Sequence, residues 1–142
     1  MPTDETSDNL WPKDLINRAV EAPIAILKEQ GLALQKLTKN VLKAEPRAMR
    51  VPDASGSGAS RLIISFVVVA PALDDYEVEL LSFEQPETLY PIKAPSFLGT
   101  RPLGPMTIAH ALAFRNHLRV CLANPKVKDL ISSLVAQSKA IG

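Results

Sequence analysis

The chain has 142 residues, of which 46% are hydrophobic and 22% charged, and its formal net charge is +1. These values are typical of a globular domain with one hydrophobic core, and they exclude a collagen-like or wholly disordered chain. At this length folding buries about 68–70% of the unfolded chain's surface, so that no metal or disulfide is required for stability. The single cysteine, Cys121, cannot form an intramolecular disulfide, which favours a cytoplasmic protein.

Two features of the chain bear on export and on membranes. The longest apolar stretch covers residues 62–73 and contains Ser65 and Pro71, whereas a membrane-spanning helix needs about 18 apolar residues or more. Residues 1–10 carry three acidic side chains and no basic one, unlike a signal peptide. We therefore predict no membrane span, a mobile acidic tail over residues 1–10 and a single domain over residues 11–142.

A helical pattern follows this tail. Apolar or small residues recur every three or four positions from about Trp11 to about Lys43, which predicts an amphipathic helix: Ile16, Val20, Ile24, Leu27, Gly31, Leu34, Thr38 and Val41. Pro23 lies inside this pattern and lacks the N–H that a helix interior needs. We therefore expect either a kink at Pro23 or a short helix followed by a longer one that begins there.

The middle of the chain predicts strands. Residues 61–70 are rich in β-branched side chains and apolar at nearly every position, as in a central strand covered on both faces. Residues 76–83 alternate between apolar and polar side chains and predict a half-buried antiparallel partner. Residues 88–93 form a third run, in which Pro91 indicates an edge strand. Residues 47–51 are a candidate first strand.

The last third of the chain combines a loop with helices. Residues 94–106 contain three prolines and two glycines, which predict a long loop. Thr107 is suited to cap a helix over residues 108–123, and the apolar spacing predicts a last helix over residues 126–139. The sequence therefore predicts an α+β fold with an N-terminal helical segment, a three- or four-stranded antiparallel meander and two C-terminal helices.

Charge is unevenly distributed along the chain. Residues 1–10 carry −3, residues 11–50 carry +4, residues 51–106 carry −4 and residues 107–142 carry +4. The predicted helices are therefore basic and the predicted sheet is acidic. A basic stripe could attract phosphate groups: Lys28, Lys36, Lys39, Lys43, Arg47 and Arg50. A solvated helix face is favoured, because the near-neutral total and the lack of interleaved aromatic residues do not indicate nucleic-acid binding.

One predicted helix carries the residues that most suggest chemistry. His117 and Cys121 are four residues apart and so share a helix face with His110 and Phe114. They could share a metal or form a thiolate–imidazole pair. However, His110 lies two turns away from His117, too far to ligate the same ion, and a catalytic pair would need a further side chain to orient the imidazole. A small buried thiol beside satisfied histidines is therefore favoured.

Four carboxylates fall within six residues, at Asp74, Asp75, Glu77 and Glu79. Their spacing does not fit a calcium-binding loop, and a polar turn followed by a solvent-facing strand explains them. The chain also lacks a glycine-rich phosphate loop and the motifs of serine hydrolases, zinc proteases and dithiol oxidoreductases. The sequence therefore predicts no catalytic residue, no metal and no cofactor, and the balance is against an enzyme.

The predicted loop places apolar side chains in a segment that cannot fold on itself, and loops of this length are often functional. Its candidate partner-binding residues are Phe97, Leu98, Arg101, Leu103 and Met106. We expect a non-enzymatic protein–protein interaction module, as a homodimer or as a subunit of a larger assembly. The reason is that a second chain could cover one face of the apolar strand over residues 61–70.

Three alternatives remain at this point. The apolar side chains of the loop could simply pack over the sheet or a helix. The N-terminal and C-terminal helices could cover opposite faces of the sheet, which would leave a monomer. The chain could also be a small-molecule-binding protein or enzyme with a pocket beneath residues 94–106. Such a pocket requires convergent polar side chains, for which the candidates are Tyr76, Tyr90, Arg101 and His110.

Four stretches of the chain resemble a small uncharacterised bacterial protein family. They are I-L-K-E-Q at 26–30, V-V-A-P-A-L-D-D-Y at 68–76, L-Y-P at 89–91 and V-K-D-L-I-S-S-L-V-A-Q-S at 127–138. The resemblance covers roughly residues 24–138. It implies a bacterial cytosolic protein, and it implies no activity, cofactor or site residue.

Overall fold

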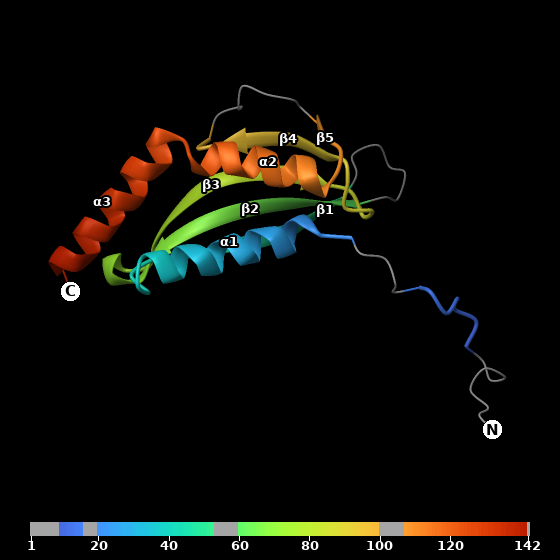
Figure 1. Cartoon of the computed structure of the whole chain (residues 1–142), viewed down its shortest axis with the longest axis horizontal. Helices are drawn as coiled ribbons and strands as arrows, with labels where there is room; N and C mark the ends of the chain where they lie inside the picture. The colour runs from blue at the N-terminus through green and yellow to red at the C-terminus, as the bar shows by residue number, and fades with distance from the viewer. Residues whose placement is uncertain (1–8, 16–19, 53–59, 100–106, 142) are drawn as a thin grey trace.

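The computed structural model describes residues 9–15, 20–52, 60–99 and 107–141. Within these ranges one helix precedes five strands and two helices follow (Figure 1): α1 (Pro23–Leu37), β1 (Lys43–Pro52), β2 (Ser60–Ala70), the 3-10 turn η2 (Pro71–Leu73), β3 (Tyr76–Gln85), β4 (Ile92–Phe97), β5 (Thr107–Ile108), α2 (Ala111–Leu122) and α3 (Pro125–Ile141). The strands form one antiparallel sheet in chain order. The predicted α+β fold is confirmed, with five strands in place of three or four. None of the described helices is long and apolar enough to cross a membrane.

The first described helix begins at a proline and ends earlier than predicted. Pro23 stands at the start of α1, where its missing N–H costs nothing. The prediction that the helix continues to about Lys43 is wrong, because α1 ends at Leu37 and Lys39 and Asn40 have φ values of 53° and 69°, outside the helical region. β1 then begins at Lys43. A shorter helix before Pro23 would include residues 16–19, which lie outside the described ranges.

The register of the central strand decides which side chains face the helices. Ile64 in β2 pairs with Ala48 in β1 and with Phe83 in β3, and directly paired residues lie on the same face of a sheet. Val68 has the same parity as Ile64 and pairs with Ala44. Alternate residues of β2, together with their partners, therefore build one continuous apolar face, which holds most of the core.

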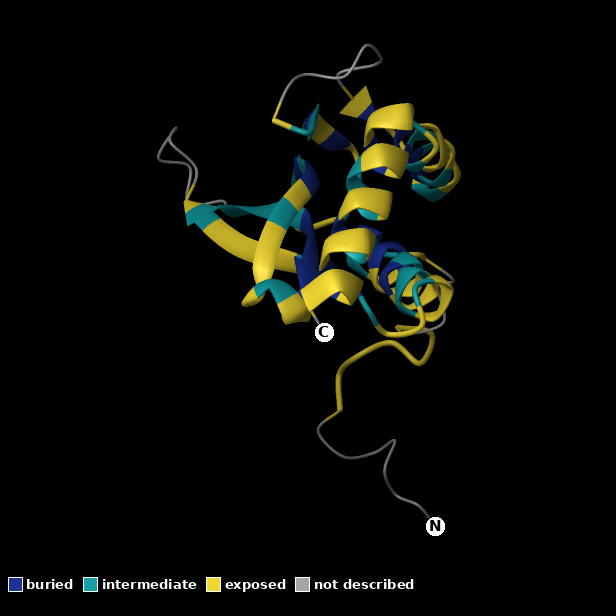
Figure 2. Ribbon diagram, turned by 90° about the vertical axis from the view of Figure 1, so that its left-hand side faces the viewer, coloured by how far each residue is buried: buried dark blue, intermediate teal, exposed yellow. Residues whose placement is uncertain are grey.

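α1 and α2 both pack on this apolar face. Gly31 of α1 lies against the carbonyl group of Ala44. Phe114 of α2 meets Phe83 edge to face, with ring centroids 5.2 Å apart. Figure 2 shows the helices on one side of the sheet and exposed strands on the other. The expectation that the N-terminal and C-terminal helices cover opposite faces is therefore wrong.

The opposite face of the sheet carries no helix among the described residues, yet its central side chains are buried. Val67 and Val69 of β2 are almost completely inaccessible. Arg47 of β1 reaches across β2 and donates two hydrogen bonds, of 2.8 and 2.7 Å, to the carboxylate of Glu77 on β3. Glu45 lies 3.3 Å from the Arg47 guanidinium. Long charged side chains thus cover the outward valines without a second chain.

Both outer strands are poor templates for further pairing. Pro46 and Pro52 are an even number of positions apart in β1, so their backbone nitrogens point to the same side of the strand. Because proline has no N–H to donate to a neighbouring strand, this side is the free edge of the sheet. At the other side of the sheet β5 has only the two residues Thr107 and Ile108. Short or proline-containing edges disfavour edge-to-edge association.

Two predictions for the last third of the chain need correction. The loop predicted over residues 94–106 is wrong at its start, because β4 continues to Phe97 and pairs with β3. Thr107 does not cap a helix, because it belongs to β5, and the N-cap of α2 is His110, whose Nδ1 accepts a hydrogen bond from the Ala113 amide. Residues 1–8 and 100–106 lie outside the described ranges.

Candidate functional site

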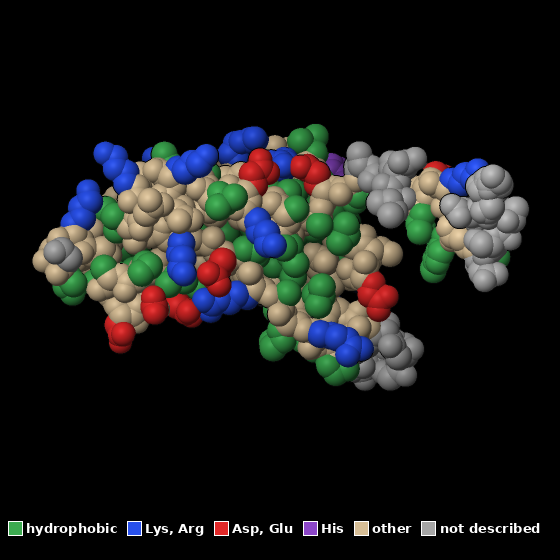
Figure 3. Space-filling model, turned by 90° about the horizontal axis from the view of Figure 1, so that it is seen from below, with side chains coloured by type: hydrophobic (Ala, Val, Ile, Leu, Met, Phe, Trp, Pro, Cys, Tyr) green, Lys and Arg blue, Asp and Glu red, His purple; other side chains and the backbone are tan. Residues whose placement is uncertain are grey.

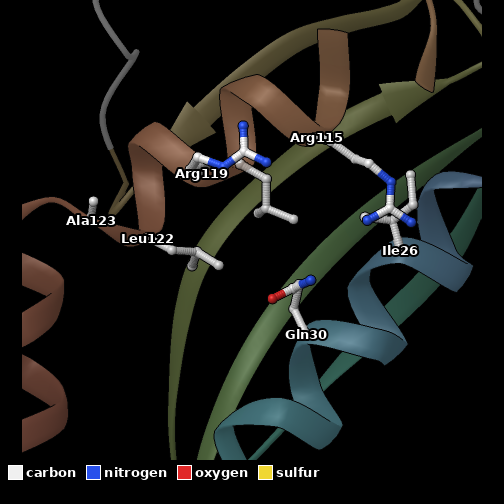
Figure 4. Close-up of a pocket in the computed structure, with 7 residues that line it drawn as sticks. Ile26, Gln30, Arg115, Arg119, Leu122 and Ala123 are labelled. Atoms are coloured by element: carbon white, nitrogen blue, oxygen red, sulfur yellow. The ribbon is translucent and has the colours of Figure 1, made fainter. Parts of the chain in front are cut away.

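Two adjoining cavities of about 340 and 420 Å³ lie between α1 and the α2–α3 pair. They share Gln30 of α1 and Leu122 of α2, so we treat them as one groove. In Figure 4 Gln30 and Leu122 point into the gap from opposite sides, with the strands of the sheet behind them. The further lining residues are Ile26, Ala33, Leu34, Leu37, Phe66, Leu80, Arg115, Leu118, Arg119, Ala123, Val127, Lys128, Ile131 and Ser132.

The larger cavity is apolar on its floor and on both walls. Phe66 and Leu80 of the sheet form its floor, Leu34 and Leu37 line it from α1, and Ile131 lines it from α3. Leu34 and Leu37 are three residues apart and so share a helix face. Leu37 is 81% exposed. An apolar surface that the fold leaves open in this way is typical of a binding site.

The floor of the groove depends on a β-bulge in β3. Phe66 pairs with Leu81, whereas the next residue of β2, Val67, pairs with Glu79, so Leu80 is the extra residue. Leu80 is buried and lines the groove, and Leu81 is buried opposite Phe66. Two consecutive leucines therefore contribute to the same apolar face.

A polar network fixes the separation of α1 and α2 at one end of the groove. Arg115 of α2 donates hydrogen bonds to the carboxylate of Glu21, which precedes α1, and to Glu29 within α1. The hydroxyl of Tyr90 donates a 2.9 Å hydrogen bond to the backbone carbonyl of Glu21. Hydrogen bonds from Arg115 lower the pKa of Glu21, and those to Glu21 and Glu29 raise the pKa of Arg115. Burial raises the pKa of Tyr90.

The rim of the groove also carries two cationic side chains. Arg119 and Lys128 both line it, and within the described ranges neither lies within ion-pair distance of a carboxylate. They belong to the segment 107–142, whose net charge is +4. Figure 3 shows the molecule from the side on which α1 lies, with hydrophobic side chains between charged ones. The groove is thus apolar inside, and its rim carries positive charge that no described carboxylate pairs with.

The histidine and cysteine of α2 contact each other in a partly buried part of the helix. Cys121 Sγ lies 3.6 Å from His117 Nε2. Burial raises the pKa of the Cys121 thiol and lowers the pKa of His117, so both groups favour their neutral forms. Within the described part of the chain, no cluster of three or more His, Cys, Asp or Glu side chains could hold a metal. The arrangement is that of the buried thiol that the sequence favours.

Of the five candidate partner-binding residues in the predicted loop, the structure describes two. Phe97 and Leu98 are partly buried and pack against the core, and the Leu98 amide donates a hydrogen bond to the Leu80 carbonyl. Arg101, Leu103 and Met106 lie outside the described ranges.

Of the polar residues proposed for a pocket beneath the loop, Tyr76 and Tyr90 lie at opposite ends of β3. Tyr76 begins β3, and Tyr90 follows the other end of that strand. His110 caps α2, and Arg101 lies outside the described ranges. Tyr76 and Tyr90 are therefore not brought together.

The sequence did contain one signal for the groove. Leu37 of α1 is apolar, lies outside the predicted apolar stripe and lines the groove. The periodicity of that stripe predicts a helix, but it does not show which other apolar side chains of the helix a neighbouring helix leaves uncovered.

Comparison of the chain with models of protein families, with curated proteins and with solved structures found no match.

The Glu21–Arg115 ion pair gives a prediction for acid conditions. Because the pKa of Glu21 is lowered in the folded protein, its contribution to stability is present above the ordinary glutamate pKa of 4.5 and is lost as the pH falls through the folded value. The destabilisation caused by Glu21→Gln should therefore be present at neutral pH and shrink below about pH 4.5. Urea unfolding of both proteins across this range measures it.

Glu87→Gln is the control for this titration. Glu87 is exposed and has no ion pair with another described residue. A destabilisation by Glu21→Gln that stays constant or grows on acidification would contradict the role given to Arg115.

Proposed function

We propose that this protein is a non-enzymatic protein–protein interaction module that associates with a second copy of itself through the groove. The observation that carries the proposal is the open apolar groove between α1 and the α2–α3 pair, with Phe66 and Leu80 as its floor. None of the residues that line it is an Asp, Glu, His or Cys. A mostly apolar lining of this kind supports binding as the role of the groove.

Other surfaces offer weaker support for self-association. Prolines interrupt the free edge of β1, which disfavours pairing of two sheets edge to edge. The outward valines of β2 are already covered by the Arg47–Glu77 ion pair. Of these three described surfaces, the groove is the one that is both apolar and open.

Charge complementarity supports a second copy as the occupant. The groove rim carries Arg119 and Lys128, so a fitting partner combines apolar side chains with negative charge. The chain itself contains such a segment near its N-terminus, where residues 1–10 carry −3 and end in Leu10, which Trp11 follows. The proposal includes a location in the cytoplasm of a bacterium. The single free thiol supports the cytoplasmic location.

Leu37→Asp tests the groove directly. Leu37 lines it and is 81% exposed, so a charge there should disturb an interface while leaving the fold intact. We expect the dimer dissociation constant to rise by about tenfold or more, because truncating or charging a central apolar contact costs on the order of 2 kcal/mol. Light scattering over a dilution series measures the molar mass.

Leu32→Asp is the matched control. Leu32 lies on the same helix and is 63% exposed, but it does not line the groove. The two variants should therefore differ in self-association at equal thermal stability. A mass of 15.4 kDa for the unmodified chain at every concentration would remove the proposal, and an equal loss of dimer in both variants would remove the groove as its interface.

A further inference from the structure

We infer that the groove of one copy is filled by residues 10–15 of the other, with the Trp11 side chain inserted over Phe66 and Leu80. This inference rests on the proposed function and adds the identity of the occupant. It assigns Trp11 as the anchor of self-association. It also assigns Lys128 as the cation that receives the acidic residues preceding Trp11.

The segment has apolar side chains that nothing in its own chain covers among the described residues. Leu10 is 92% exposed and Trp11 is 70% exposed, and Leu15 is also exposed. The Leu15 amide donates a hydrogen bond to the Pro12 carbonyl, which forms a turn. Three large apolar side chains within six residues favour a protein contact, because tryptophan at the centre of an interface is among the most frequent hot spots.

The groove fits such a segment in size and in charge. Its larger part encloses about 420 Å³, within the range of cavities that hold ligands larger than an indole ring. Lys128 lines this part, and it has no carboxylate partner in the described ranges. Residues 1–10, which precede Trp11 in the sequence, carry a charge of −3, and this charge is complementary to that of the lysine.

The direction of the chain favours a second copy as the acceptor. Glu21 is held by Arg115 at one end of the groove, and the described residues 9–15 extend away from the helices (Figure 1). Two copies can exchange their segments reciprocally, which repeats one contact around a two-fold axis. Each aromatic ring buries about 150–250 Å², so Leu10 and Leu15 must contribute area beside Trp11 for two segments and their grooves to reach the roughly 1,200 Å² that a specific interface needs.

Fluorescence provides the most direct test, because Trp11 is the only tryptophan of the chain. In the full-length protein at concentrations where light scattering reports a dimer, we expect Trp11 emission to be shifted to the blue and protected from iodide. On dilution, both properties should be lost over the same range of protein concentration in which the molar mass falls from that of a dimer to that of a monomer. Leu37→Asp should abolish them and Leu32→Asp should leave them unchanged.

Two substitutions test the assigned contacts by mass alone. Trp11→Ala should raise the dimer dissociation constant by about tenfold or more. It should leave the thermal midpoint unchanged at low concentration, because the side chain is exposed in a single copy. Lys128→Glu should also weaken the dimer, whereas Lys126→Glu, two residues earlier in α3 and outside the groove lining, should not.

The outcomes separate this inference from the proposed function. A dimer that depends on Leu37 but leaves Trp11 accessible to iodide would overturn the inference and retain the function. A monomer with Trp11 protected at every concentration would place the segment in its own groove and overturn both. A monomer with Trp11 accessible at every concentration would also overturn both.

Discussion

Replacing Gly31 with alanine is expected to destabilise the protein by about 3 kcal/mol or more, even though alanine normally favours a helix by about 1 kcal/mol over glycine. A Cβ atom at this position would lie 2.1 Å from the carbonyl oxygen of Ala44. The oxygen belongs to the backbone of β1, so no side-chain rotation relieves the clash and α1 must move away from the sheet. Urea or thermal unfolding monitored by circular dichroism measures the loss.

A substitution elsewhere on the same helix provides the control. Ala25 is exposed in α1, and Ala25→Gly should cost about 1 kcal/mol through helix propensity alone. Alanine is thus expected to be the better residue at position 25 and the worse one at position 31. A Gly31→Ala variant as stable as the original chain would show that α1 does not approach β1 as closely as described.

Phe114→Ala is expected to cost about 3–5 kcal/mol. The ring is fully buried and meets Phe83 edge to face at 5.2 Å, so truncation removes buried area, leaves a cavity and ends the aromatic contact. Phe114 also anchors α2 to the sheet, and α2 forms one wall of the groove. Denaturant unfolding gives the free energy, and self-association of the variant should weaken with it.

The control for this position lies on the opposite side of α2. Leu112 is largely exposed, and Leu112→Ala should change the free energy of unfolding by less than about 0.5 kcal/mol. A cost below about 1 kcal/mol for Phe114→Ala would contradict the docking of α2 on Phe83.

The elements that sequence patterns predict well are those whose pattern persists over many residues. The strand predicted over residues 61–70 from its nearly continuous apolar run is β2, and the last predicted helix is α3 with slightly wider bounds. On α1 the predicted stripe contains Leu27 and Gly31, and both are buried. In these cases the local run of residues encodes which positions of a regular element are buried.

The missed features depend on geometry that is not local. Thr38 and Val41 continue the apolar spacing and therefore predict a helix that runs to about Lys43. In the structure α1 ends earlier, because the chain turns at residues 39 and 40. β5 has two residues, too few for any pattern. The groove depends on the distance between α1 and α2, which Arg115 and Glu21 set across 94 residues of sequence.

The bulge in β3 adds one residue to the strand without changing which side of the sheet its two halves present to the helices. Before the bulge Tyr76 and Val78 lie opposite the inward residues of β2, and after it Leu81 and Phe83 take that role. Loss of Leu80 would leave a regular strand, in which Glu79 still opposes Val67 and Leu81 still opposes Phe66, so the faces of the sheet would be kept. The side chain that such a deletion removes lies in the floor of the groove. A relative that has lost this one residue is therefore expected to keep the fold and to have a different groove.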